Sequence, residues 1–177
     1  MLDIKKIKAL FGLLNDELKK DGITGEVGIC GGAVMCLVFQ TRKATKDVDA
    51  IFEPTAEIRM AAKKIAHREG LPEDWLNDAA KVYFHADPPR ENVLEFSNLR
   101  VWAPRADYML AMKCMSARFD TADAGDVKFL IGYLRLKNPE QVFKIIKKYY
   151  PHRQVPAKTQ FFVEELFDAP QGPRDPG

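Results

Sequence analysis

The segment DVDAIFE, residues 47–53, constrains the fold of this chain more than any other feature. Val48, Ala50 and Phe52 alternate with Asp47, Asp49 and Glu53. An alternation with a period of two predicts a β-strand with one apolar face and one polar face. Aspartate is depleted in strands, so two aspartates in one strand need a chemical reason.

A glycine pair, Gly31 and Gly32, precedes this strand. The segment before the pair, EVGIC at 26–30, is strand-like. The segment after it, AVMCLVFQ at 33–40, predicts a short buried helix, although periodicity alone does not distinguish such a run from a strand. A basic loop, TRKATK at 41–46, then leads to the strand with the aspartates.

Helices and strands alternate through the first hundred residues. The N-terminal segment 1–20 has apolar residues at helical spacing. Thr55 is a plausible N-cap of a second helix, and Gly70 suits the C′ position after its last turn. Segments 93–96 and 99–103 predict two short strands or one bent strand pair.

From Pro104 onward the pattern is helical. Residues 104–119 are apolar nearly all round, as in a helix packed on several sides. Asn138 and Pro139 predict the start of a helix that ends before Pro151, and 159–167 predicts a last one. The sequence predicts an α+β fold: a small mixed sheet flanked by helices at 1–103, a helical segment at 104–168 and a disordered tail at 169–177.

Composition excludes several classes of protein. The 27 basic and 25 acidic side chains almost balance, so no overall field favours a membrane surface or nucleic acid. The three cysteines lack CxxC spacing and the three histidines are scattered, which argues against a disulfide framework and a zinc site. The sequence therefore predicts a cytoplasmic protein that does not enter a membrane.

The two aspartates suit metal binding. Side chains at i and i+2 of a strand point to the same face, with Cα atoms about 6.5–7 Å apart. Carboxylate oxygens are the ligands that Mg²⁺ prefers, and Mg²⁺ often completes its coordination with substrate phosphates. Glycines at a turn before a helix let a phosphate approach backbone N–H groups. The alternative is an amphipathic strand with a hydrated face and glycines that only make the turn.

The order of these features resembles the signature of the nucleotidyltransferase superfamily. That signature is a hydrophobic residue, a G-[GS] pair, a spacer and D-h-[DE]-h; here Gly31-Gly32 precedes Asp47-Val48-Asp49 by fourteen residues. Segments 72–81 and 99–126 resemble a bacterial branch of that superfamily known only as a domain of unknown function. That branch resembles nucleotidyltransferase toxins of abortive-infection systems, and the resemblance extends over residues 5–168.

The resemblance implies transfer of a nucleoside monophosphate from an NTP to an RNA, protein or small-molecule acceptor. It implies that Asp47 and Asp49 bind Mg²⁺ or Mn²⁺, and that Gly31 and Gly32 hold the triphosphate. A third carboxylate is expected on a neighbouring strand, and its candidate is Glu95, with Glu91 behind it. The alternative is a noncatalytic domain of the same fold, a binding or regulatory module in a mobile defence or toxin-antitoxin locus.

Several candidates have a structural alternative. Glu95 is equally explained as a surface residue of an edge strand. Lys113, which the resemblance places at the nucleotide, is the one charge in an apolar helical run and needs an anion. A triphosphate or an ion pair with Asp123 or Asp126 would satisfy it. The basic loop 41–46 and the basic stretch 144–158 are weak indications of an RNA partner.

Overall fold

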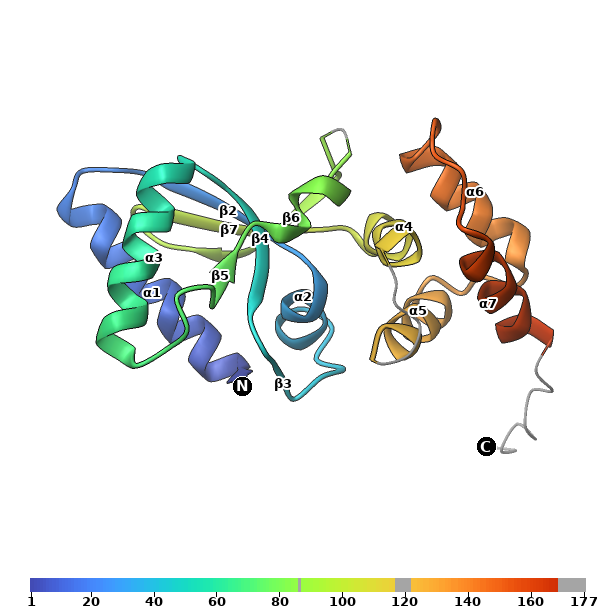
Figure 1. The fold of residues 1–177 in the computed structure, drawn as a ribbon, viewed down its shortest axis with the longest axis horizontal. Coiled ribbons are helices and arrows are strands. Elements are labelled where there is room, and N and C mark those ends of the chain that lie inside the picture. The colour runs from blue at the N-terminus through green and yellow to red at the C-terminus, as the bar shows by residue number, and fades with distance from the viewer. Residues whose placement is uncertain (86, 117–121, 169–177) are drawn as a thin grey trace. The chain divides into compact units, whose positions relative to one another are not determined.

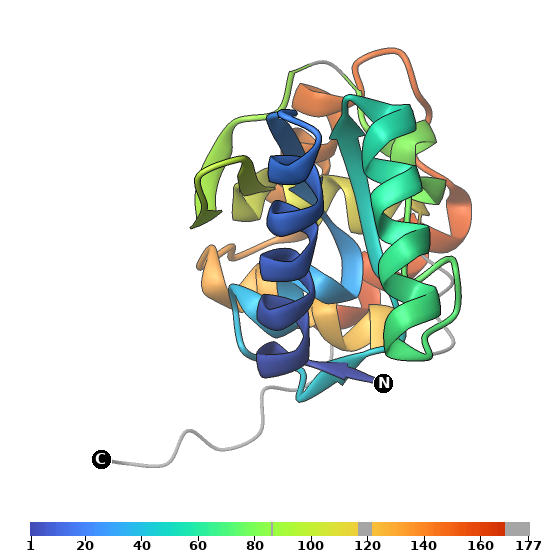
Figure 2. The same cartoon turned by 90° about the vertical axis from the view of Figure 1, so that its left-hand side faces the viewer.

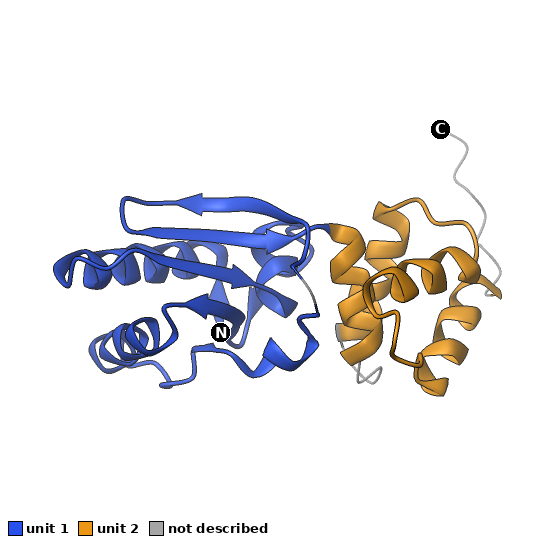
Figure 3. Ribbon diagram, turned by 90° about the horizontal axis from the view of Figure 1, so that it is seen from above, with its two compact units in different colours: residues 1–105 blue, residues 106–177 orange. Residues whose placement is uncertain are grey.

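The computed structural model describes residues 1–85, 87–116 and 122–168, and the predicted disordered tail lies outside them. The chain divides into two compact units, unit 1 at residues 1–105 and unit 2 at residues 106–177 (Figure 1, Figure 3). The change to a helical pattern in the sequence predicts this boundary after residue 103, two residues earlier. The predicted α+β class is confirmed, because unit 1 contains a mixed sheet with helices and the described part of unit 2 is helical.

A five-stranded sheet forms the centre of unit 1, in the order β5-β4-β2-β7-β6. Its strands are β2 (Gly25–Ile29), β4 (Val48–Glu53), β5 (Leu76–Asn77), β6 (Arg90–Glu95) and β7 (Leu99–Pro104). Strand β2 pairs antiparallel with β4 and parallel with β7; β4 and β5 are parallel, and β6 and β7 are antiparallel. The two short strands predicted at 93–96 and 99–103 are therefore a hairpin whose first strand starts earlier.

The predicted alternation of β4 is confirmed. Val48, Ala50 and Phe52 are buried, whereas Asp49 is half-buried and Glu53 is exposed. Paired residues of neighbouring strands point to the same side of a sheet. The register therefore continues the apolar side through Val27, Ile29, Leu99 and Val101. We call the other side the polar face; it carries Asp49, Ile51, Glu53, Glu26, Gly28, Arg100 and Trp102.

Helices α1 (Ile4–Lys20) and α3 (Thr55–Glu69) cover the apolar side of the sheet, side by side (Figure 2). A Cβ on Gly25 would stand 2.9 Å from Leu18 of α1 and 3.0 Å from Ile58 of α3, which places both helices against this side. Gly70 ends α3 in the left-handed conformation, as the sequence predicted.

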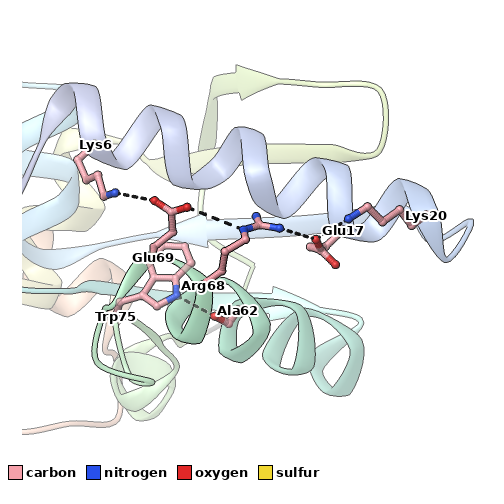
Figure 4. Close-up of polar contacts among 7 residues, drawn as sticks. All are labelled: Lys6, Glu17, Lys20, Ala62, Arg68, Glu69 and Trp75. Atoms are coloured by element: carbon pink, nitrogen blue, oxygen red, sulfur yellow. Dashed lines mark hydrogen bonds and ion pairs between the residues drawn. The ribbon is translucent and has the colours of Figure 1, made fainter.

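A chain of ion pairs joins α1 and α3 (Figure 4). Lys6 Nζ lies 3.0 Å from Glu69 Oε2, and Arg68 Nη1 lies 3.1 Å from Glu17 Oε1. Lys20 Nζ lies 2.7 Å from the same Glu17 oxygen. The hydrogen bonds from Lys20 and Arg68 lower the pKa of the Glu17 carboxyl, which outweighs the effect of its burial.

Three shorter elements complete the description of the first half of unit 1. Helix α2 (Gly31–Leu37) is buried from Ala33 onward, which agrees with the predicted short buried helix. Strands β1 (Leu2–Asp3) and β3 (Ala44–Thr45) form a separate two-stranded sheet. This pairing folds the basic loop 41–46 back toward the start of the chain.

The sequence did not predict the secondary structure of the segment between α3 and β6. It contains β5 and a 3₁₀ helix, η1 (Ala79–Tyr83), which contacts β4. Trp75, just before β5, is buried, and its indole N–H donates a 3.0 Å hydrogen bond to the Ala62 carbonyl of α3. This bond attaches the segment to α3.

Unit 2 contains α4 (Ala106–Ser116), α5 (Ala122–Tyr133), α6 (Pro139–Tyr149) and α7 (Ala157–Asp168). Helix α4 contacts both α5 and α6, and residues 108–114 are all buried, as predicted for a helix packed on several sides. The Asn138 side chain caps α6 by accepting a hydrogen bond from the Gln141 N–H. The Thr159 hydroxyl of α7 donates to the Cys114 carbonyl of α4 at 2.9 Å.

Across the described part of the chain, none of the helices combines the length and the apolar character needed to traverse a bilayer.

Candidate functional site

Asp49 and the glycine pair meet where β4 runs beside the turn between β2 and α2. The Cys30 N–H donates to the Asp49 carbonyl at 2.9 Å, which continues the pairing of β2 with β4. Gly31 has a φ of +58°, a left-handed conformation that favours glycine. A Cβ on Gly31 would stand 2.9 Å from Asp49 Oδ2. The carboxylate of the second aspartate therefore lies directly against the first glycine.

The second glycine is approached by the basic loop. A Cβ on Gly32 would stand 2.5 Å from Thr45 Oγ1 and 3.4 Å from Arg42 Nη1. Strand β3 thus brings a hydroxyl to the turn, and the loop before β3 brings a guanidinium. The sequence raised Arg42 as a basic-loop residue, but only the fold shows that it lies beside Gly32. The side chains of Asp49 and Thr45 explain both glycines sterically, so the predicted contact with a triphosphate stays a prediction.

Asp47 and Asp49 are both half-buried. Asp49 lies within β4, whereas Asp47 immediately precedes the strand. Two carboxylates two residues apart are a donor set that suits Mg²⁺ or Mn²⁺. Among the described residues, no three His, Cys, Asp or Glu side chains are grouped closely enough to hold a metal ion. A cation bound by this pair would therefore need further ligands, such as phosphate oxygens and water.

Glu95 does not belong to this pair. The register aligns it with Arg100 of β7, then with Glu26 of β2 and Glu53 of β4. Asp49 lies four residues from Glu53, about 13 Å along β4, and the three inter-strand spacings from β4 to β6 add about 14 Å across the sheet. The prediction that Glu95 is a third ligand is wrong on this geometry, because a shared metal ion needs oxygens within about 2–2.6 Å of it.

Strand β7 offers no replacement for Glu95. Its residues on the polar face are Arg100, Trp102 and Pro104, and Trp102 is paired with Gly28 of β2. A Cβ on Gly28 would stand only 2.2 Å from a Trp102 ring carbon, so the indole lies flat on this glycine. None of the residues of β7 on the polar face is therefore a carboxylate.

The charge on Lys113 is neutralised within unit 2. Its Nζ lies 2.6 Å from Asp123 Oδ1 and 2.7 Å from Asp126 Oδ2 of α5, and the Lys113 side chain is 9% exposed. The structure shows the ion pair, which was one of the two alternatives predicted for Lys113. A triphosphate partner for Lys113 stays a prediction.

The polar face also holds a cavity of about 420 Å³ that the sequence did not reveal. Ile51 and Trp102 contribute to it from the sheet, and Phe84 contributes from the segment after η1. Arg90 of β6 places its guanidinium 4.5 Å from the centroid of the Trp102 ring. Only the register brings these residues together, because none of them belongs to a local motif.

Comparison of the chain with protein-family models, with curated proteins and with solved structures finds no match. The assignment of a function therefore depends on the residues and geometry described above.

Proposed function

We propose that the chain is a metal-dependent nucleotidyltransferase that moves a nucleoside monophosphate from an NTP to an acceptor. The observation that supports this proposal is the contact of the Asp49 carboxylate with the Gly31 turn, with Asp47 two residues earlier along the chain. This is the combination of a glycine pair and paired carboxylates that the resemblance requires.

In the proposed reaction an acceptor oxygen attacks the α-phosphorus of the NTP, and pyrophosphate leaves with the electrons of the broken P–O bond. A bound divalent cation would neutralise the charge of the triphosphate. Asp47 and Asp49 would hold that cation. Arg42, beside Gly32, is well placed to bind phosphate oxygens through charge-assisted hydrogen bonds.

One observation favours a second candidate function, a binding or regulatory module without catalytic activity. The residues of β7 on the polar face are Arg100, Trp102 and Pro104, and no third carboxylate joins Asp47 and Asp49 among the described residues. A two-metal displacement needs ligands for both ions. Such a module would still bind an NTP, but it would transfer nothing.

Calorimetric titration with ATP, GTP, CTP and UTP, in Mg²⁺ and in EDTA, tests the shared part of both functions. We expect binding of at least one NTP in Mg²⁺ only. Replacing both Asp47 and Asp49 with asparagine should weaken it by at least tenfold, because each removes a charged ligand worth roughly 1.5–3 kcal/mol. The matched control replaces two exposed aspartates, Asp21 and Asp74, with asparagine.

Transfer assays distinguish the two functions. Each NTP labelled at the α-phosphate is incubated with the protein and with total RNA or total protein as acceptor. Label that becomes covalently attached, and that disappears in the Asp47→Asn, Asp49→Asn variant, supports the enzyme. Binding without transfer supports the module. Absence of NTP binding, or binding equal in both double variants, contradicts both.

A further inference from the structure

We propose that the cavity on the polar face binds an organic cation, a primary amine carried on a ring or another apolar body. The proposal does not depend on the nucleotidyltransferase activity, because it rests on side chains of the polar face other than Asp47, Asp49 and the glycine pair. The cavity volume of about 420 Å³ lies within the range of sites that take small organic molecules.

The apolar part of the cavity is built from rings and one aliphatic side chain. Trp102 and Phe84 meet edge to face with centroids 6.2 Å apart, and Ile51 stands beside them on β4. The Trp102 ring is held between Gly28 below and the Arg90 guanidinium above. This wall is already ordered by the chain itself, so a ring or alkyl body can bind against it without further ordering of these side chains.

The charged part of the cavity has an unbalanced carboxylate. Glu26 and Glu53 are directly paired across β2 and β4, an arrangement in which like charges repel. Arg90 Nη1 reaches Glu26 Oε1 at 2.9 Å. Within the described chain, the one contact of the Glu53 carboxylate is a hydroxyl, Thr55 Oγ1 at 3.4 Å, and it forms no ion pair.

The other charged side chains around the cavity do not neutralise the negative charge of Glu53. Asp78 is neutralised by Arg59, with 2.8 Å between Oδ2 and Nη2. Arg90 is shared between Glu26 and Asp87, and both carboxylates raise the pKa of its guanidinium. Lys81 of η1 is exposed and lines the cavity, and it forms no ion pair with Glu53 among the described residues. An ammonium group carries three donors, so it can bridge Glu26 and Glu53.

The test uses the two tryptophans, which are both in unit 1. Protein labelled with ¹⁵N-tryptophan gives two indole N–H resonances, and the one that is lost in Trp102→Phe belongs to Trp102. Phenethylamine should shift the Trp102 resonance saturably. It should leave the resonance of Trp75 unchanged, because Trp75 does not line the cavity and its indole N–H is bonded to the Ala62 carbonyl of α3. 3-Phenylpropionate, with a similar body and the opposite charge, should bind at least tenfold more weakly.

Glu53→Gln should weaken the binding of phenethylamine by roughly tenfold, since it removes a charged acceptor. The matched control is Glu91→Gln, an exposed residue of β6 whose partner in the register is Ala103, on the apolar side of the sheet. Glu26 is left intact because its loss would release Arg90 into the cavity. Equal affinity for the two ligands, equal affinity of the two variants, or a Trp102 resonance that no ligand moves would each overturn the proposal.

Discussion

Replacing Gly28 with alanine should destabilise unit 1 by about 1–3 kcal/mol, the usual cost of forcing an extra carbon into a packed site. The added Cβ would stand 2.2, 2.5 and 2.6 Å from three ring atoms of Trp102. Ordinary contacts to a Cβ begin near 3.4 Å, so the ring must move by about 1.2 Å. Phe84 and the Arg90 guanidinium contact the ring as well, so such a shift disturbs neighbouring contacts.

The assay is denaturant unfolding followed by tryptophan fluorescence. Both tryptophans lie in unit 1, so the signal reports on this unit alone. The matched control is Gly12→Ala in α1, where a Cβ would have no neighbour within 4 Å. Because glycine in a helix interior costs about 0.5–1 kcal/mol relative to alanine, this variant should be more stable than the natural protein.

A double-mutant cycle tests the cause. In a Trp102→Leu background, Gly28→Ala should cost much less, and the difference, about 0.5–3 kcal/mol, is the coupling between the two positions. Trp75 still reports the unfolding in that background. A stability of Gly28→Ala within about 0.5 kcal/mol of the natural protein, or the same cost in both backgrounds, would refute the reasoning.

Three further predictions concern buried or paired groups. Lys113→Met should destabilise unit 2 by about 3–5 kcal/mol, measured by far-UV circular dichroism in denaturant, because Asp126 is left buried without its cation. Burial raises the pKa of the Cys114 thiol to about 12, so mass spectrometry should find it unmodified by iodoacetamide at pH 8 until the unit unfolds. The lowered pKa of Glu17 means that its ion pairs stabilise the fold above the unfolded pKa of about 4.3 and cease to do so as pH falls through the folded pKa. Glu17→Gln should therefore lose stability at pH 7 and little at pH 3.

Each of these has an outcome that contradicts it. If Lys113→Met with both Asp123→Asn and Asp126→Asn is no more stable than Lys113→Met alone, an uncompensated buried charge is not the cause of the loss. Rapid modification of Cys114 in the folded protein would show that Cys114 is not buried in the packing of α4. A difference between Glu17→Gln and the natural protein that does not depend on pH would exclude the ion pairs as its source.

Local signals in the sequence were enough to predict several of the longer elements. The alternation at 47–53 gave β4, Gly70 marked the end of α3, and Asn138 marked the start of α6, because each depends on residues close in the chain. Strand β5 was not predicted, because it is only two residues long and is defined by its pairing with Val48 and Asp49 of β4. No local pattern marks such an element.

The geometry of the candidate site was less predictable, because it depends on register between distant strands. The separation of Glu95 from Asp49 follows from three successive pairings across the sheet. The contact between Gly28 and Trp102 depends on the same register. The residues next to Gly28 and Trp102 in the sequence form no pattern that predicts this contact. The ion pair of Lys113 could be predicted from the sequence as one of two alternatives, since a single charge in an apolar helix requires an anion nearby.

The position of β2 at the centre of the sheet has a consequence for synthesis of the chain. Gly28 pairs with Ile51 and with Trp102, 23 and 74 residues further along. A nascent chain that ends before β7 can form the first pairing, but it leaves the other edge of β2 without a partner. Unpaired strand edges favour association with other chains. We therefore expect the nascent chain to need a chaperone most while its synthesis has passed β4 and has not yet reached β7.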